Sequence, residues 1–167
     1  MVLTYFKHDF NQKRTRDNGQ TLGPRVTRVP VKIIAQREFF VTMRFMDTRA
    51  TCLNCMDGRA QLPVLTWIKA NYPVDFVDVI TEAGMDGVLA RQEDISEIRR
   101  SIRVSVELNR STRIFVVGHH DCRGNPVEET RHRKDIADAV TRLRPLWPGQ
   151  DVIGLWVNDR WQVEPVS

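Results

Sequence analysis

The sequence has 167 residues, which is enough for one domain of ordinary size. Hydrophobic residues make up 41% of it and charged residues 28%, a balance typical of a globular chain rather than a disordered one. Three cysteines are too few, and odd in number, for a disulfide scaffold. We therefore expect the thiols to be free or bound to metal, in a reducing, cytoplasmic compartment.

Two further classes of protein are excluded by the hydropathy pattern. The sequence has no uncharged apolar run of about eighteen residues, which excludes a membrane-spanning helix and gives no reason to expect a membrane partner. The first residues lack a basic start followed by an apolar core, so we expect no ordinary secretory signal.

The net charge of +4 is concentrated at the beginning of the chain. Residues 1–44 carry a net charge of +6 and the remaining residues carry −2. We therefore expect a basic N-terminal arm at 1–44 and a folded domain at 45–167. Such an arm can bind nucleic acid or an acidic partner, extend into solvent, or pack across a neighbouring subunit. Nucleic acid is disfavoured because no basic motif with interleaved aromatic residues accompanies the charge.

The first thirty residues are rich in turn-forming types and predict irregular structure, with short strands or arm segments at 29–34 and 39–43. Strand-like and helix-like segments then alternate. In chain order they are a strand at 50–56, a helix at 62–72, a strand at 74–84, a helix from 94, a strand at 113–120, a helix within 125–143, and a strand from 151 that turns at 158–159 into a short extended piece. This order predicts an α/β fold with a mostly parallel sheet of four to five strands, flanked by helices on both faces.

Three of these segments carry more specific expectations. The strand at 113–120 is apolar on both faces, which is typical of a central strand in a covered sheet. The helix at 62–72 is expected to place Leu62, Leu65 and Ile68 or Lys69 on one face. The helix from 94 is expected to be amphipathic, with the following apolar residues at helical spacing: Ile95, Ile98, Ile102 and Val106.

Polar clusters at 55–59 and 118–124 follow two of the predicted strands. Functional residues gather at the carboxyl ends of strands in an open parallel sheet. If the two strands are neighbours, the Cys55 thiolate meets Cys122 and a histidine, either His119 or His120. Two thiolates and one imidazole are ligands that zinc prefers, and three protein ligands leave a fourth position for water or substrate. The spacing to Cys122 favours His119 as the ligand.

Asp57 and Arg59 add a second feature to the first cluster. Arg59 can hold Asp57 in a bidentate, charge-assisted pair, so that Asp57 orients a water or hydroxide on the metal. A carboxylate without such a partner could instead ligate the metal and close the site. Zinc lowers the pKa of bound water. Because two thiolates donate more charge than imidazoles do, we expect activity that rises on the alkaline side.

These motifs resemble those of the β-class carbonic anhydrases. Cys-x-Asp-x-Arg at 55–59 is followed by His-x-x-Cys at 119–122, after an apolar strand that ends in glycine. The stretch 79–84 resembles that family's strand ending in an Ala-Gly turn, and 153–159 resembles its last strand. The resemblance covers roughly residues 50–162.

The resemblance implies a zinc-binding α/β domain at 45–167. It implies that Cys55, His119 and Cys122 hold Zn²⁺, with Asp57 and Arg59 as the gating and orienting dyad. It also implies reversible hydration of carbon dioxide to bicarbonate by a zinc-bound hydroxide, and a homodimer or higher oligomer whose active sites lie near the subunit interface.

Two positions depart from the family pattern. Gly58 stands where the family usually has Ser or another small side chain, and Arg123 stands where a glycine is common, which would put a cation at the mouth of the site. The chain therefore resembles a compact, divergent member. Hydrolysis of carbonyl sulfide or carbon disulfide on the same site stays open, as does a non-catalytic zinc-binding module whose basic arm binds an acidic partner.

Several residues also have plainer interpretations. Cys52 and Cys55 form a C-x-x-C that could be a redox pair or half of a zinc knuckle. Residues three apart on a strand point to opposite faces, so we expect Cys52 to be a buried core residue. Asp121 is expected in a turn. The remaining expectations are packing roles for Trp67, Trp147, Trp156 and Trp161, and exposed positions for His8 and His132.

Overall fold

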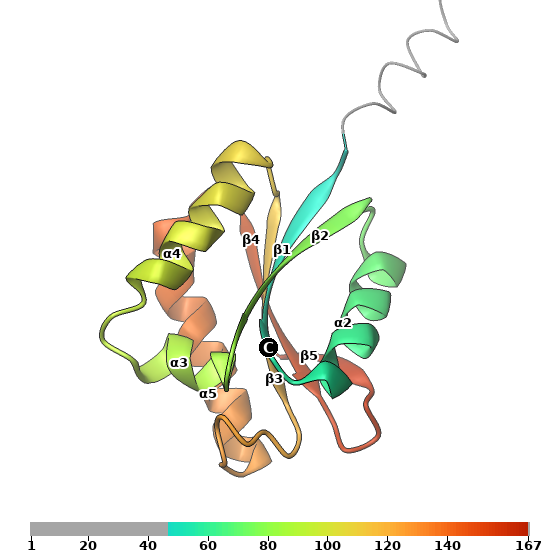
Figure 1. The fold of residues 1–167 in the computed structure, drawn as a ribbon, viewed down its shortest axis with the longest axis vertical. Coiled ribbons are helices and arrows are strands. Elements are labelled where there is room, and N and C mark those ends of the chain that lie inside the picture. Colours follow the sequence, from blue (N-terminus) through green and yellow to red (C-terminus); the bar gives the residue numbers. More distant parts are fainter. Residues whose placement is uncertain (1–46, 167) are drawn as a thin grey trace, which may run out of the picture. The chain divides into compact units, whose positions relative to one another are not determined.

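The computed structural model describes residues 47–166 of the chain. They form a five-stranded sheet with the strand order β2-β1-β3-β4-β5 (Figure 1). The strands are β1 (Arg49–Cys55), β2 (Phe76–Glu82), β3 (Arg113–His119), β4 (Asp151–Val157) and β5 (Val163–Val166). The first four pair in parallel, and β5 pairs antiparallel with β4. The expected arm at 1–44, with its strand candidates and His8, lies outside the described residues.

Helices cover both faces of the sheet. They are α2 (Gly58–Asn71), α3 (Met85–Arg91), α4 (Ser96–Arg103) and α5 (Glu129–Leu143), with a π-helical turn η1 (Val104–Leu108) after α4 and a 3₁₀ turn η2 (Arg144–Leu146) after α5. Figure 1 shows α2 on one face and α3, α4 and α5 on the other. The predicted α/β architecture is therefore confirmed. None of the helices in this part of the chain combines the length and apolar character needed to cross a membrane.

The centre of the sheet is β3, as its sequence predicted. Six of its seven residues are buried, and it pairs with β1 on one side and β4 on the other. Side chains alternate between the two faces of a strand. Phe115 and Val117 therefore pack in the core under α2, whereas Ile114 and Val116 pack in the core under α3, α4 and α5. The residues that follow β3 lie at the carboxyl edge of the sheet.

Helix α2 differs from the prediction in its start and in its buried face. It begins at Gly58, directly after β1, because the Asp57 carboxylate accepts a hydrogen bond from the Arg59 N–H at 2.9 Å and caps the helix. The buried stripe follows a spacing of four residues: Ala60, Val64 and Ile68. Leu62, which we expected on the buried face, is 74% exposed. Ile68 is buried as expected, and Leu62 was wrongly grouped with it because a large leucine was given more weight than the small Ala60.

Two further expectations on this side of the sheet were incomplete or wrong. Helix α3 was not expected, because its seven residues are too few to show a helical period. The amphipathic helix from 94 is confirmed, and it continues as α4 and η1. His132 was expected to be exposed but is only 1% exposed. It lies on the sheet-facing side of α5, four residues before Ile136, and it bonds to Asp86 of α3.

Candidate metal centre

The carboxyl ends of β1 and β3 bring Cys55, His119 and Cys122 together. Cys55 is the last residue of β1 and His119 is the last residue of β3, and the two strands are neighbours in the sheet. Cys122 lies in the turn that follows β3. One potential ligand atom from each residue lies within 4.8 Å of the other two, and all three residues are buried. The two sequence motifs thus converge at one point.

The ring of His119 is oriented by its own chain. Its Nδ1 lies 2.7 Å from the backbone carbonyl of His120, which can only accept a hydrogen bond, so Nδ1 carries a proton and donates it. The Nε2 atom is buried and has no hydrogen-bond partner among the described residues. Because a buried polar atom without a partner costs free energy, this nitrogen is suited to a ligand that the protein does not itself supply. His120 is exposed and contributes only its backbone.

The two thiols lie 3.7 Å apart, sulfur to sulfur. A hydrogen bond from Cys122, together with the backbone N–H of Gly84 at 3.5 Å, lowers the pKa of Cys55 against the opposing effect of burial. The same contact and burial raise the pKa of Cys122. A divalent cation bound by both sulfurs would stabilise both of them as thiolates.

A close contact between two glycines joins the turn after β2 to the turn that carries Cys122. A Cβ at Gly84 would lie 2.4 Å from the backbone carbon of Gly124, and a Cβ at Gly124 would lie 2.4 Å from the backbone nitrogen of Gly84. Gly84 also has a φ of +63°, which favours glycine. The family pattern placed a glycine directly after the last cysteine, and here Gly124, one residue later, makes the close contact.

Asp57 and Arg59 form the expected pair beside the cluster. The Arg59 Nε donates to both Asp57 carboxylate oxygens at 3.1 Å, and an Nη donates to Oδ2 at 2.6 Å. These hydrogen bonds from Arg59 lower the pKa of Asp57 to about 2. The Asp57 carboxylate is therefore ionised, and acts only as an acceptor, throughout the physiological pH range.

Arg59 also connects the two motifs, which the sequence did not predict. Its guanidinium donates to the Asp121 carboxylate at 3.0 Å and to the Asp121 carbonyl at 3.1 Å. It lies over the ring of Trp161, 5.0 Å from the ring centre, and that ring is 6.2 Å from the ring of His119. Asp121 is in a turn, as expected, with a φ of +51°. Neither partner carried a sequence signal, because both contacts depend on the tertiary fold.

The donor set suits a zinc ion. Sulfur and imidazole nitrogen are the ligands of many zinc sites, and a site with three protein ligands is typical of catalytic rather than structural zinc. Such an ion would satisfy two features of this structure, the unpartnered Nε2 of His119 and the two thiols 3.7 Å apart. The residues therefore fit the metal that the sequence suggested.

Other candidate residues lie apart from the cluster. Cys52 is fully buried in the core under α2, and burial raises the pKa of its thiol to about 12, so its expected core position is confirmed. A Cβ at Gly58 would have no atom within 4 Å, so this departure from the family pattern has no steric consequence. Arg123 is exposed.

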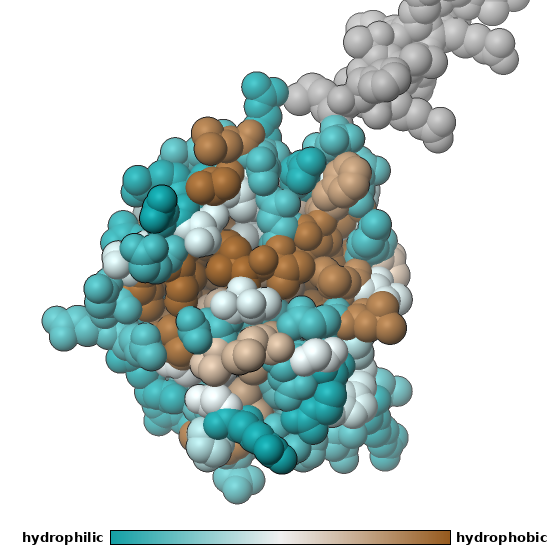
Figure 2. All heavy atoms as spheres, viewed as in Figure 1, coloured by the Kyte–Doolittle hydropathy of each residue, from teal (hydrophilic) through white to brown (hydrophobic). Residues whose placement is uncertain are grey.

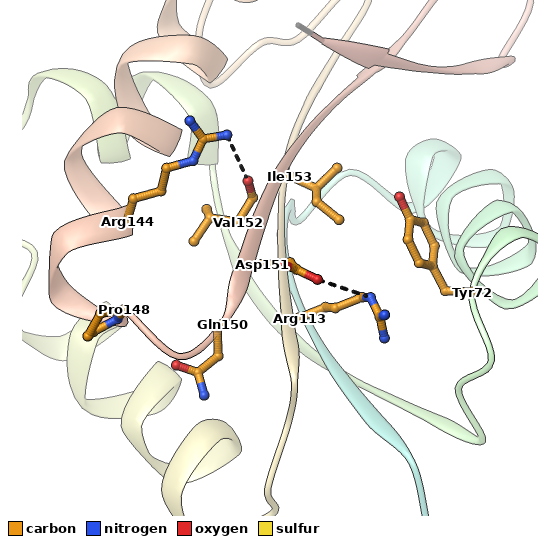
Figure 3. Close-up of a pocket in the computed structure, with 8 residues that line it drawn as sticks. All are labelled: Tyr72, Arg113, Arg144, Pro148, Gln150, Asp151, Val152 and Ile153. Atoms are coloured by element: carbon orange, nitrogen blue, oxygen red, sulfur yellow. Dashed lines mark hydrogen bonds and ion pairs between the residues drawn. The ribbon is translucent and has the colours of Figure 1, made fainter.

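A hollow of about 560 Å³ lies at the opposite end of the sheet (Figure 3). It lies beside the first residues of β3 and β4, and its lining includes Tyr72, Arg113 and Arg144. None of the three cluster residues lines it, so this hollow is separate from the candidate centre.

Comparisons with known proteins identify the family and the fold. A family model described as "Putative carbonic anhydrase" matches residues 45–167. No curated protein sequence matches the chain.

Solved structures with a similar fold include three carbonic anhydrases. A carbonic anhydrase from Streptococcus mutans has 15% sequence identity and a TM-score of 0.53, covering 80% of this chain and 95% of that chain. One of two tetrameric β-carbonic anhydrases from Sordaria macrospora has 14% identity and a TM-score of 0.52, covering 80% and 88%. An isoform from Trichomonas vaginalis has 18% identity and a TM-score of 0.51, covering 80% and 94%. At these identities the comparison supports the fold.

Proposed function

The chain belongs to the family described as putative carbonic anhydrases, and from this membership we propose that it is a zinc-dependent lyase that hydrates carbon dioxide reversibly to bicarbonate. The observation that carries the proposal is the convergence of Cys55, His119 and Cys122 beside the ion pair of Asp57 and Arg59. Family membership supplies the reaction class, and the residues below supply its machinery in this chain.

Cys55, His119 and Cys122 would hold the ion through two sulfurs and the Nε2 nitrogen. When bound, zinc would supply Lewis-acid chemistry that makes hydroxide available from water near neutral pH. The backbone carbonyl of His120 fixes the tautomer of His119 that presents Nε2. The N–H of Gly84 offsets part of the negative charge on Cys55.

Asp57 and Arg59 would control the orientation of the nucleophile. The Asp57 carboxylate is ionised, so it accepts a hydrogen bond from the attacking oxygen and never donates one. Arg59 engages both carboxylate oxygens of Asp57 and is itself held by Asp121 and Trp161. We propose that this anchoring keeps Asp57 an acceptor beside the ion and prevents it from becoming a fourth ligand.

Trp161 would form an apolar wall beside the site. Its ring lies near the ring of His119 and below the guanidinium of Arg59. An apolar surface next to the donors suits a substrate as small and uncharged as carbon dioxide, and it excludes water that would compete for the same space.

Stopped-flow hydration of carbon dioxide tests the proposal. Zinc-loaded wild-type protein should accelerate hydration at pH 7 and more strongly at pH 9, and a chelator should abolish the acceleration. Cys122→Ser, which removes one sulfur, should lack activity while retaining the fold by circular dichroism. A folded, zinc-loaded wild-type protein with no rate above buffer would reject the proposed activity.

We also propose that the protein associates into a homodimer or higher oligomer. Strand β2 is an edge of the sheet, and two of its apolar side chains, Phe76 and Val79, are 48% and 38% exposed. Figure 2 shows apolar side chains gathered across this face of the molecule. An exposed apolar edge is typical of an association surface, and the Sordaria macrospora enzymes are tetrameric. Sedimentation equilibrium of the full chain tests this, and Val79→Asp should shift the mass toward the monomer.

A further inference from the structure

A buried network of polar side chains lies behind the turn that carries Cys122. Its four core members come from α3, from the turn after β3 and from α5, and each is at most 2% exposed: Asp86, Asn125, His132 and Asp135. Arg91 and Arg131 reach the network from its exposed side and pair with Asp135. Two buried carboxylates are costly to keep in a core, so the network calls for a physical explanation beyond packing.

Asn125 lies at the centre of this network. Its Nδ2 group donates to Asp86 at 3.1 Å and to Asp135 at 3.2 Å, and its Oδ1 accepts from Arg91 at 2.8 Å. Both amide hydrogens and the amide oxygen are thus satisfied. The reverse orientation would place the oxygen against two carboxylates, so the neighbours fix the amide in one position.

The remaining contacts hold the two carboxylates in place. The Nδ1 of His132 lies 2.5 Å from the Asp86 carboxylate. Burial alone would raise the pKa of Asp135, but hydrogen bonds from Arg91, Asn125 and Arg131 outweigh it and hold that pKa below its usual range. Asp135 is therefore ionised and accepts the hydrogen bond from Asn125.

The network touches the chain beside two of the three candidate ligands. The backbone N–H of Asn125 donates to the carbonyl of Cys122 at 3.2 Å. A Cβ at Gly118, the residue before His119, would lie 2.8 Å from the Asp86 carboxylate. The network therefore contacts the candidate centre at two places, through Asn125 beside Cys122 and through Asp86 against Gly118, the residue before His119.

We propose that Asn125, held by Asp86 and Asp135, is a positioning residue that fixes the Cys122 turn in the geometry needed to bind zinc. The inference rests on the proposed function, since it takes the three-residue cluster to be a zinc site. Asn125 does not touch the cluster sulfurs through its side chain. It acts by holding the backbone on which Cys122 is carried, so that the site is assembled before the ion arrives.

Removal of such a supporting contact typically lowers metal affinity by about 10- to 100-fold. The experiment measures the zinc dissociation constant of the full-length chain by competition with a chromophoric chelator. It also records the visible spectrum of the Co²⁺-loaded protein and the unfolding transition of the metal-free protein. Asn125→Ala should weaken zinc binding by about 10- to 100-fold and change the Co²⁺ spectrum, because the sulfur geometry relaxes.

The matched control is Ser105→Ala. Ser105 is also buried and hydrogen-bonded, but it lies at the opposite end of β1 and touches Thr51 and Asp78 rather than the Cys122 turn. It should lower the stability of the metal-free protein and leave zinc affinity and the Co²⁺ spectrum unchanged. A purely structural role for Asn125 predicts the same behaviour from both variants.

A milder variant covers the case in which Asn125→Ala fails to fold. Arg91→Gln removes the donor to the Asn125 Oδ1 from a partly exposed position, and it should weaken zinc binding by about 10-fold, the lower end of that range. Wild-type zinc affinity in whichever of these two variants folds would overturn the inference and leave the proposed function intact. A wild-type protein that binds no zinc would overturn both.

Discussion

Two clusters of buried polar side chains form around β1, one at Thr51 and one at Cys55, which lie on the same face of the strand. They differ in how many of their polar atoms have hydrogen-bond partners. At Thr51, the hydroxyl groups of Ser105 and Ser111 lie 2.7 and 2.9 Å from the threonine oxygen. Hydrogen bonds continue from Ser105 to Asp78 and from Ser111 to a backbone carbonyl. At Cys55, the sulfur lies 3.7 Å from that of Cys122, and the Nε2 of the neighbouring His119 has no hydrogen-bond partner among the described residues.

The difference separates a structural cluster from a candidate functional one. Around Thr51 each hydroxyl is hydrogen-bonded, so the cluster contributes to stability and offers no atom to a ligand. Around Cys55, two sulfurs and a nitrogen lie near one another, and the nitrogen has no hydrogen-bond partner among the described residues. Changes at the Thr51 end should therefore alter stability, and changes at the Cys55 end should alter zinc binding and activity.

The largest effect should be on zinc content, in a comparison of serine substitutions at Cys55 and Cys52. Cys55→Ser should reduce bound zinc from about one ion per chain to near none, because a hydroxyl is a poor replacement for a thiolate ligand. Cys52→Ser is the matched control, since Cys52 is buried in the other core and does not touch the cluster. Elemental analysis after dialysis measures both, and equal zinc content in the two variants would contradict the distinction.

Arg59→Lys should be next in size. A lysine cannot reproduce the side-on pairing with Asp57 and the simultaneous contact with Asp121, so the carboxylate loses its fixed orientation. We expect kcat/KM for carbon dioxide hydration to fall about 100-fold, with zinc content unchanged. Arg123→Ala, at an exposed position near the same turn, should change neither quantity. Loss of zinc in Arg59→Lys would assign Arg59 a structural role instead.

At the Thr51 end the expected effect is on stability alone. Thr51→Val keeps the shape of the side chain but removes the hydroxyl, and it should lower the free energy of unfolding by about 1–3 kcal/mol. Thr112→Val, at an exposed position, should stay within about 0.5 kcal/mol of wild type. Urea unfolding of the metal-free protein measures both, and zinc affinity should be unchanged in each. Weaker zinc binding in Thr51→Val would show that the two clusters are coupled.

The smallest effect should be on how stability depends on acid pH, through the carboxylate of Asp78. Burial would raise the pKa of Asp78, but hydrogen bonds from Asn109 and Ser105 and the charge of Arg49 hold it below its usual value. Because the folded-state pKa is the lower one, the stability that Asp78 contributes is present above its unfolded pKa and is lost as the pH falls through the folded value. Stability measured from pH 6 to pH 3 should therefore decline less steeply in Asp78→Asn. Parallel slopes would contradict this.

The sequence was informative where one segment carried its own pattern. The apolar segment at 113–120 predicted a central strand, and the alternation of strands and helices predicted the parallel sheet. Because β1 and β3 are neighbours and the carboxyl ends of parallel strands meet at one edge, the convergence of Cys55 with His119 and Cys122 followed from topology.

The sequence was uninformative where a role depends on contacts between distant segments. His132 has the composition of an exposed helix around it, and only packing against the sheet and pairing with Asp86 explain its burial. Asn125 looks like an ordinary loop residue in the sequence. Its role is not visible there because its three partners come from the distant helices α3 and α5. Asp121 and Trp161 acquire their contacts with Arg59 in the same way.

X-ray absorption at the zinc edge of the wild-type protein is the most direct measurement of whether this edge of the sheet binds the ion as described. Two sulfur atoms at about 2.3 Å, one nitrogen at about 2.0–2.1 Å and one further light atom from water are expected around each zinc. A protein purified without zinc that takes up none, or a zinc surrounded by four protein ligands including the Asp57 carboxylate, would contradict an open zinc site.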